Sequence, residues 1–391
     1  MTRSLLPAVA LILSSTVAAP LWADASSAPA APAPAAPVSA GVPDAAKPSK
    51  PSEVELKAAE YLVSQQEPNG AWMSKAGPGV TALVLKGMIQ AGKTPEDPAV
   101  KKAIDFIETF RQEDGGYYKD SNPNYNTAIV LSAFSVLPRE QYKDKIAKAQ
   151  AFLKSIQHVE GHKDADGKEI TKDHPWYGGA GYGNSRRPDL SNTAFLVQAL
   201  HDSGLPANDP AIQAALVFTT RCQMNSETNP LPLAAGQDSG GFIYSTNKGG
   251  ESMFGNEERD GKTVLRAYGS MTYAGLKSMI HAGLTKDDPR VKAAMKFITN
   301  NWTLETNPAV ESPQGQYYYY HTFAKAMHTY GEDVITDARG IKHDWRKEFN
   351  DQMAKLRRED GSWMNTKSER WLEGNPILCT GYVLLALQEA R

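Results

Sequence analysis

The sequence is poor in the features that mark several common classes of protein. Its 391 residues include only two cysteines, Cys222 and Cys379, too few for a disulfide scaffold, although a single bond could form between them in an exported protein. Cys379 lies in an apolar stretch, which favours burial as a small hydrophobic side chain. The net charge of -2 provides no basic field, so we expect no nucleic-acid partner.

An apolar run long enough to span a membrane is also missing from the N-terminal region. The run from Leu5 to Ala19 is shorter than the ~20 residues that a spanning helix needs, and Pro7 interrupts it. Arg3 precedes this run and small residues follow it, a pattern typical of a secretory signal. We predict a signal peptide over residues 1–25, export to the periplasm or the extracellular space, and no transmembrane span in the mature chain.

The next segment, residues 26–52, consists mainly of Ala, Pro, Ser and Lys. Such a composition cannot bury a core and favours extended, polyproline-like chain, so we interpret it as a linker. The remaining residues, 53–391, exceed the usual length of about 100–200 residues for one compact domain. They therefore contain either two domains or a repeat architecture.

A repeat is visible in the apolar helices that the sequence predicts. Each begins near a threonine and continues with apolar residues at helical spacing; the threonines are Thr81, Thr127, Thr193, Thr272, Thr322 and Thr380. A second helical pattern precedes each of these, and Asp-Pro pairs such as Asp209-Pro210 mark helix starts between units. Six helical hairpins that cannot bury their apolar faces alone predict an all-α fold, an (α/α)6 toroid over residues 53–391.

Turns with glycine and an aromatic residue connect the two helices of several units. The turn with Gln66, Gly70 and Trp72 resembles the QW repeat of squalene-hopene cyclases and protein prenyltransferase β subunits. The resemblance extends over nearly all of residues 53–391 and implies the (α/α)6 toroid of that family. Activity has to be argued separately from the fold.

The DxDDTA motif of squalene-hopene cyclases is similar to residues 189–194, Asp-Leu-Ser-Asn-Thr-Ala. In that family the middle aspartate protonates the polyene, and here Ser191 stands in its place. A hydroxyl is far too weak an acid for this step. Asp189 is retained, either as a candidate catalytic acid or as the N-cap of the helix that follows.

Prenyltransferase β subunits bind zinc through an Asp-x-Cys pair and a later histidine before a threonine. The matching positions hold Ser270, Thr272 and Cys379, and the pair His321-Thr322 lies one repeat earlier. A lone histidine does not make a zinc site. We therefore expect no metal and no cofactor.

Two long insertions, residues 158–188 and 223–267, both lead from an outer helix to an inner helix, so they must lie at the same mouth of the ring. Arg187, Arg266 and Arg370 lie just before inner helices there and are candidates to bind an anionic group; surface ion pairing is the alternative. Aromatic candidates for the ligand-binding wall are Tyr268, Tyr273 and Trp363, although most aromatic residues of such a ring pack in the core.

Three functions remain open from the sequence. The first is binding or processing of an isoprenoid or another anionic-headed small molecule or lipid in the ring. The second is a polysaccharide lyase-like enzyme, in which an arginine neutralises a uronate and Tyr320, beside His321, moves the proton. The third is a non-catalytic interaction protein. An apolar cavity favours the first, an open cleft with carboxylates the second, and a filled ring the third.

Overall fold

The computed structural model describes residues 50–183, 187–259, 261–310 and 312–391. These residues belong to one compact unit that spans Ser49–Arg391. The predicted signal peptide, residues 1–25, and nearly all of the predicted linker, residues 26–52, lie outside the described residues and stay predictions. Across the described ranges, no helix is both long and apolar enough to cross a membrane.

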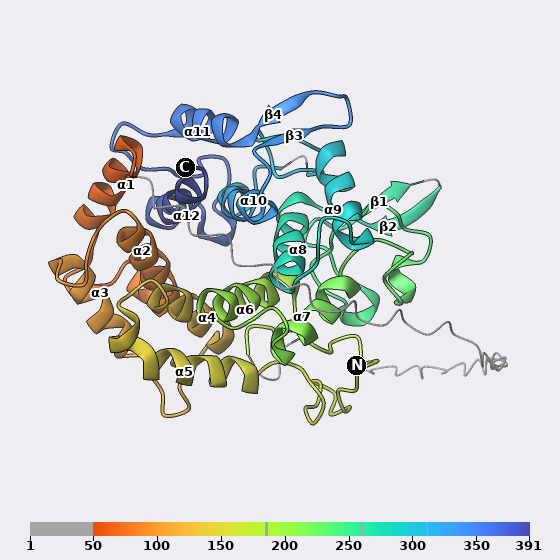
Figure 1. The fold of residues 1–391 in the computed structure, drawn as a ribbon, viewed down its shortest axis with the longest axis horizontal. Helices are drawn as coiled ribbons and strands as arrows, with labels where there is room; N and C mark the ends of the chain where they lie inside the picture. The colour runs from red at the N-terminus through yellow and green to blue at the C-terminus, as the bar shows by residue number, and fades with distance from the viewer. Residues whose placement is uncertain (1–49, 184–186, 260, 311) are drawn as a thin grey trace, which may run out of the picture. The chain divides into compact units, whose positions relative to one another are not determined.

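Six of the α-helices in the described residues form a closed inner ring (Figure 1). Each packs against the next, and the last packs against the first. They are α2 (Pro78–Gln90), α4 (Pro123–Phe134), α6 (Leu190–Asp202), α8 (Gly269–His281), α10 (Gln316–Tyr330) and α12 (Pro376–Glu389). These are the helices predicted at the repeated threonines, so the all-α toroid is confirmed.

The other six α-helices of the described residues lie outside this ring (Figure 1). They are α1 (Glu53–Ser64), α3 (Pro98–Glu108), α5 (Arg139–Ser155), α7 (Pro210–Arg221), α9 (Pro289–Asn300) and α11 (Trp345–Leu356). Asp209 and Asp288 cap α7 and α9 by accepting hydrogen bonds from backbone amides, as the Asp-Pro pairs predict. The outer helices bury one face each, whereas the inner helices are buried nearly all round.

The remaining elements are short. Two antiparallel hairpins pair β1 (Asn256–Arg259) with β2 (Lys262–Leu265) and β3 (Val334–Thr336) with β4 (Lys342–Asp344). Short 3-10 helices are η1 (Ser74–Ala76), η2 (Pro232–Ala234), η3 (Asn247–Gly249) and η4 (Arg370–Leu372). The first hairpin belongs to the second long insertion and η4 to the chain that leads into α12, so both lie close to the inner-helix starts.

The repeated glutamine and threonine hold each turn in place. The Gln66 amide donates to the carbonyl oxygen of Gly70 (3.0 Å) in its own turn and to that of Ala99 (2.8 Å) in the next outer helix. The Thr81 hydroxyl oxygen accepts a hydrogen bond from the backbone N–H of Trp72 (3.0 Å). Because both contacts are buried or partly buried, the motif satisfies backbone groups that no helix can pair.

In the fifth inner helix, α10, the side chain that bonds to the preceding connection lies two residues before the threonine. The Thr322 hydroxyl donates to the carbonyl oxygens of Tyr318 and Tyr319 in its own helix, not to a turn. Tyr320 takes over instead, because its hydroxyl donates to the carbonyl oxygen of Leu304 (2.8 Å) in the preceding connection. The sequence placed the repeat at Thr322 because only a threonine matched the pattern.

The two cysteines are both free and buried. The Cys379 thiol donates to the carbonyl oxygen of Glu373 at 3.0 Å. Cys222 ends α7 and is fully buried. Burial rather than a disulfide is therefore the state of both side chains.

Candidate functional site

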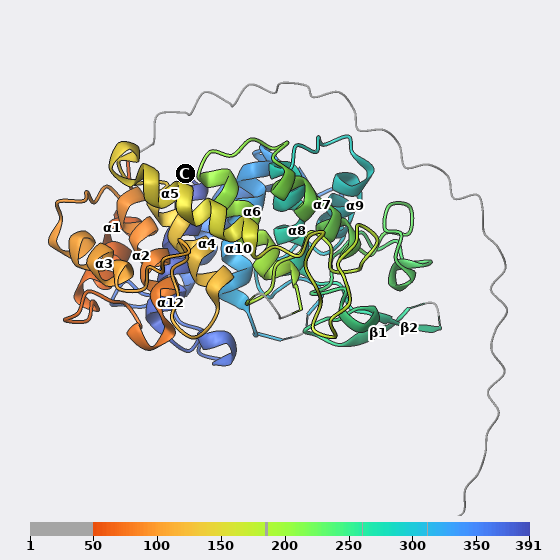
Figure 2. The ribbon, with the colours of Figure 1, turned by 90° about the horizontal axis from the view of Figure 1, so that it is seen from below.

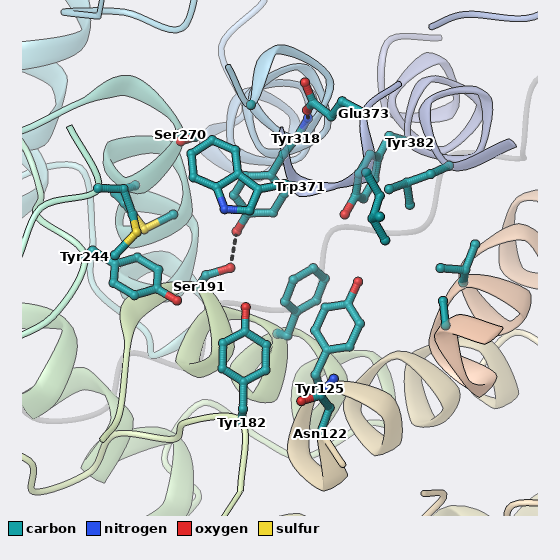
Figure 3. A pocket seen from close by; sticks show the side chains of 18 of the residues that line it. Asn122, Tyr125, Tyr182, Ser191, Tyr244, Ser270, Tyr318, Trp371, Glu373 and Tyr382 are labelled. Atoms are coloured by element: carbon teal, nitrogen blue, oxygen red, sulfur yellow. Dashed lines mark hydrogen bonds between the residues drawn. The ribbon is translucent and has the colours of Figure 1, made fainter. Parts of the chain in front are cut away.

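A cavity of about 340 Å³ opens at the end of the ring where the inner helices begin. All six inner helices contribute described residues to its wall, and the connections before α6, α8 and α12 complete it (Figure 3). The β1–β2 hairpin of the second insertion lies at the lower edge of the ribbon in Figure 2. Its aromatic residues are Tyr125, Tyr182, Phe195, Tyr244, Phe254, Tyr268, Tyr318, Trp371 and Tyr382. The long insertions thus meet at one mouth, as their positions in the sequence predicted.

Helix geometry explains which residues face this cavity. Successive residues turn by about 100° in an α-helix, so positions two before and two after the repeated threonine lie on the opposite side from it. Tyr125, Phe195 and Tyr382 occupy such positions and line the cavity. The sequence analysis missed these three and Phe254; the first three follow from the register of the threonine, which was the available signal.

A pair of hydroxyl groups stands where squalene-hopene cyclases have their acid. The Ser191 Oγ and Tyr318 hydroxyl oxygen lie 2.8 Å apart and both residues line the cavity (Figure 3). Burial raises the pKa of the Tyr318 phenol further above its ordinary value. The hydroxyls of Tyr125, Tyr182 and Tyr382 also point into this space (Figure 3). These hydroxyl groups are neutral donors and acceptors, and none of them is a carboxylic acid.

Asp189 is fully buried and caps α6. One carboxylate oxygen accepts the backbone N–H of Asn192 and the other accepts its side-chain amide, both at 2.8 Å. Burial raises the pKa of Asp189 to about 6, against the opposing effect of the hydrogen bonds from Asn192. Asp189 does not belong to the described residues that line the cavity. Its geometry is that of an N-cap, and a catalytic role stays a proposal.

Glu373 carries the only carboxyl group among the described lining residues. One of its oxygens accepts the backbone N–H groups of Tyr317 and Tyr318, each at 2.8 Å, at the start of α10. The other accepts the Asn365 side-chain amide at 2.8 Å. Burial raises the pKa of Glu373. Glu373 is 1% exposed, so it acts as a buried cap of α10 and not as a surface partner for an arginine.

Two of the three candidate arginines lie against aromatic residues of the cavity wall. The Arg187 guanidinium lies 5.5 Å from the ring centre of Tyr244 and 2.9 Å from the carboxylate of Glu251. The Arg370 guanidinium lies 4.3 Å from the ring centre of Trp371 and donates to the Gln314 side chain at 2.6 Å. These contacts place Arg187 and Arg370 at the rim.

Arg266 is held differently. Its guanidinium donates to the backbone carbonyl oxygens of Ala309 and Asn256, both at 3.4 Å. Among the described residues, Arg187 and Arg370 lie over aromatic rings of the wall and Arg266 does not, so the structure does not group it with the other two arginines.

The aromatic candidates divide between cavity and core. Tyr268 lines the cavity. Tyr273 packs against Phe323 in the core, with ring centres 5.2 Å apart. The Trp363 indole is fully buried and donates to the carbonyl oxygen of Met353 at 2.9 Å. Tyr273 and Trp363 face away from the cavity because they pack between inner and outer helices.

Tyr320 and His321 are neighbours in sequence but face different spaces. The Tyr320 hydroxyl accepts a hydrogen bond from the Gln316 amide at 2.7 Å, near a separate pocket toward α11. His321 lines a small pocket inside the ring. Neither lines the aromatic cavity. The structure therefore does not bring this predicted proton-transfer pair together with the arginines.

The positions that bind zinc in prenyltransferases hold groups with other roles. The Ser270 hydroxyl accepts a hydrogen bond from the Asn307 amide at 3.2 Å, and the Thr272 hydroxyl accepts the backbone N–H of Phe242 at 3.1 Å. In the part of the chain that the structure describes, no three His, Cys, Asp or Glu side chains converge as a metal site.

Comparisons with known proteins agree with this architecture. A family model of the squalene-hopene cyclase C-terminal domain matches residues 43–126 and 79–185. Squalene–hopene cyclase from Zymomonas mobilis is 27% identical over 134 residues, which are 28% of this chain and 20% of that protein. The chain thus matches about a fifth of the length of this relative.

Solved structures extend the similarity to most of the chain. The apo structure of the type II terpene cyclase MstE from Scytonema matches with a TM-score of 0.51 at 12% identity. The match covers 86% of this chain and 96% of the MstE chain. A protein from Actinoplanes has a TM-score of 0.49 at 16% identity, covering 86% and 98%. The closed ring of helices defines an α/α toroid. Within that class, residues 43–185 are similar to the squalene-hopene cyclase C-terminal domain, and the ring as a whole resembles a type II terpene cyclase.

Proposed function

We propose that the protein is exported and binds a small molecule with an isoprenoid-like or ring-bearing body and an anionic head. The body would occupy the aromatic cavity, and the head would lie at its rim. The observation that carries the proposal is the cavity itself: about 340 Å³, within the range of about 300–1,000 Å³ for small-molecule sites, with a mainly aromatic and apolar wall.

The wall suits an unsaturated apolar body. Phe195, Phe254, Met253 and Met271 supply apolar surface, and the tyrosine rings present their faces and edges to π-bonds or rings of the ligand. The hydroxyl pair of Ser191 and Tyr318 would accept or donate one hydrogen bond to a polar substituent. The one carboxyl group of the described wall, Glu373, already accepts hydrogen bonds with both of its oxygens, and Ser191 stands at the position of the cyclase acid. Binding without squalene-type cyclisation is therefore the function that the described side chains support best.

The rim suits an anion. Arg187 and Arg370 are both accessible at their tips and lie over wall aromatics, and charge-assisted hydrogen bonds contribute about 1.5–3 kcal/mol each. Glu251 and Gln314, which they now contact, are replaceable by a phosphate or carboxylate of the ligand. Because these arginines lie over different rings, each would contribute separately.

The glycan-acting alternative has less support from this geometry. It needs an arginine, a tyrosine and a histidine around one sugar, and Tyr320 and His321 lie away from the arginine-bearing rim. An interaction protein without a ligand is also less favoured, since the start of the ring is hollow rather than filled.

The test is a titration with farnesyl diphosphate, farnesol and a trigalacturonate, followed by intrinsic tryptophan fluorescence, because Trp371 lines the cavity. We expect farnesyl diphosphate to bind more tightly than farnesol, and Arg187→Ala and Arg370→Ala each to weaken the diphosphate by roughly tenfold. Arg339→Ala, at an exposed arginine in the β3–β4 turn, is the control. Binding of the trigalacturonate but not of either isoprenoid would replace this proposal by the glycan alternative.

A further inference from the structure

A second and smaller pocket lies inside the ring, on the far side of Phe195, which lines both this pocket and the aromatic cavity. Every inner helix contributes to it from the same level, five positions after the repeated threonine, or after Tyr320 in α10. These residues are Lys86, Ser132, Gln198, Lys277, Lys325 and Leu385. Three of the six positions are lysines, which is an unusual density of positive charge inside a helical ring.

Two of these lysines have counter-charges. The Lys86 ammonium lies 2.6 Å from a carboxylate oxygen of Asp202 and donates to the Ser132 hydroxyl at 2.8 Å. The Lys325 ammonium lies 2.8 Å from a carboxylate oxygen of Glu389. Each carboxylate comes from the next helical turn, four residues beyond the pocket level in α6 and α12. Both carboxylates also act on the third lysine through their charge, but the ion pairs that they form in the described residues are with Lys86 and Lys325.

Lys277, on α8, is the third lysine and has no partner within the described ranges. It is 5% exposed, and no hydrogen bond or ion pair links its amine to a described residue. Burial, followed by the charge of Lys325, lowers the pKa of Lys277 to about 7. The charges of Asp202 and Glu389 oppose this shift without contacting the amine. A buried ammonium without a contacting counter-charge is unfavourable, so this site either loses a proton or gains an anion.

A second polar side chain, that of His321, lines the same pocket. His321 is 4% exposed, and its Nδ1 has no hydrogen-bond partner. Burial, followed by the charge of Lys325, keeps the pKa of His321 well below its usual range, so the imidazole is neutral. His281 lies one turn beyond Lys277 on the same helix, and burial likewise keeps its pKa low. Neither histidine supplies the missing negative charge.

We propose that this pocket is a binding site for one small monovalent anion, a halide, held between the Lys277 ammonium and the polar groups of the ring. The pocket volume is about 30 Å³, and a single buried water takes about 10–15 Å³ of such space. One halide fits, whereas phosphate, carboxylate or sulfate groups do not. The side chains of Leu83, Ile129 and Leu385 form the apolar part of the wall and favour a weakly hydrated ion.

A bound anion would link three of the inner helices across the middle of the ring. With its charge neutralised, Lys277 would link α8 through the ion to Lys86 on α2 and Lys325 on α10. An ion that binds only the folded chain stabilises it in proportion to the logarithm of the ion concentration once the site is saturated. The proposal does not depend on the ligand of the aromatic cavity.

The direct experiment is a crystal structure of the purified protein in sodium bromide, with anomalous scattering to locate the ions. We expect a bromide peak within hydrogen-bonding distance of the Lys277 amine. Peaks confined to exposed lysines, with waters in this pocket, would overturn the proposal and show that Lys277 is neutral. This experiment needs no variant.

Thermal unfolding supplies an independent measure. At constant ionic strength, with gluconate replaced by bromide in steps, the wild-type Tm should rise with the logarithm of bromide concentration. Lys277→Met should unfold at a temperature that does not depend on bromide, while the exposed Lys101→Met should behave as the wild type. An equal bromide dependence in Lys277→Met and wild type would contradict a specific site.

Discussion

The hydroxyl groups of Ser191 and Tyr318 meet at 2.8 Å across the aromatic cavity, one from the start of α6 and the other from α10. Squalene-hopene cyclases, which the chain resembles, have an aspartic acid where Ser191 stands. The serine hydroxyl and the tyrosine phenol can orient a polar group, but neither is an acid strong enough to protonate an alkene. The residue at the position of the cyclase acid therefore cannot perform that family's first step.

The purified protein should therefore not convert squalene to cyclic products, as measured by gas chromatography of extracts after incubation. The reason is the residue type at position 191, since the remaining acid of the motif, Asp189, is held as a helix cap. Hopene-like products that disappear in Asp189→Asn would contradict this and would show that the acid function had moved by two positions.

Asp189 should make stability depend on pH in a characteristic direction. Its pKa is raised from 3.8 to about 6 in the folded chain, so the fold favours the neutral acid. The stabilisation is complete below the unfolded value and is lost as pH rises through about 6. Relative to Asp189→Asn, the wild type should lose about 2 kcal/mol of unfolding free energy between pH 4 and pH 7, at ~1.36 kcal/mol per unit of pKa. Urea unfolding at several pH values measures this difference.

Asp288, which caps α9, provides the control with the opposite sign. Although burial raises it, the hydrogen bonds and charge of Arg290 lower the pKa of Asp288 overall. The wild type should lose stability relative to Asp288→Asn as pH falls, not as it rises. If both comparisons gave the same pH trend, the change would reflect acid denaturation of the whole chain and not the burial of Asp189.

The repeated threonine should matter only where it bonds to a turn. The buried Thr272 hydroxyl accepts the Phe242 N–H at 3.1 Å, and Thr272→Val leaves that donor unpaired, at a cost of about 1–3 kcal/mol. In the fifth helix Thr322 bonds only to carbonyl oxygens of its own helix, so Thr322→Val should cost less than about 1 kcal/mol. Equal losses in thermal or urea unfolding would contradict the shifted register of α10.

Gly178 should resist substitution because of a close approach to an outer helix. Its φ is +82°, and a Cβ there would lie 1.7 Å from the carbonyl oxygen of Ala214 in α7. Gly161 has φ +91° with nothing within 4 Å of such a Cβ. Both alanine variants incur the left-handed backbone penalty, but only Gly178→Ala adds overpacking of about 1–3 kcal/mol. Equal losses of the urea unfolding midpoint in Gly178→Ala and Gly161→Ala would contradict this, because they would show that α7 can move away from residue 178.

Much of the fold follows from local sequence signals. Asp-Pro starts, apolar stripes and the threonine-led helices specify which segments are inner and outer, because these signals act within one or two helical turns. The lengths of residues 158–188 and 223–267 identify the mouth that carries the loops, since both connect the same kinds of helix end. These features required no knowledge of long-range contacts.

The site was harder to predict because it depends on register and distant partners. Tyr320 replaces a threonine in function while Thr322 stands nearby, so a pattern based on residue type misplaces the fifth helix by two positions. Tyr268 and Tyr273 are five residues apart in sequence, yet one lines the cavity and the other packs in the core. The pairing of Arg187 with Glu251 joins residues from two separate insertions, which no local pattern reveals.

The central claim is that the aromatic cavity itself holds the ligand. Ala76 lines the cavity from η1 and is only partly buried, so Ala76→Trp can fill the cavity without disrupting the core. Ala338→Trp, at an exposed position after β3, adds the same side chain elsewhere. Calorimetric titration with farnesyl diphosphate should give one site per chain in the wild type and in Ala338→Trp, and at least a roughly tenfold weaker affinity in Ala76→Trp. Unchanged affinity in a folded Ala76→Trp would contradict the account.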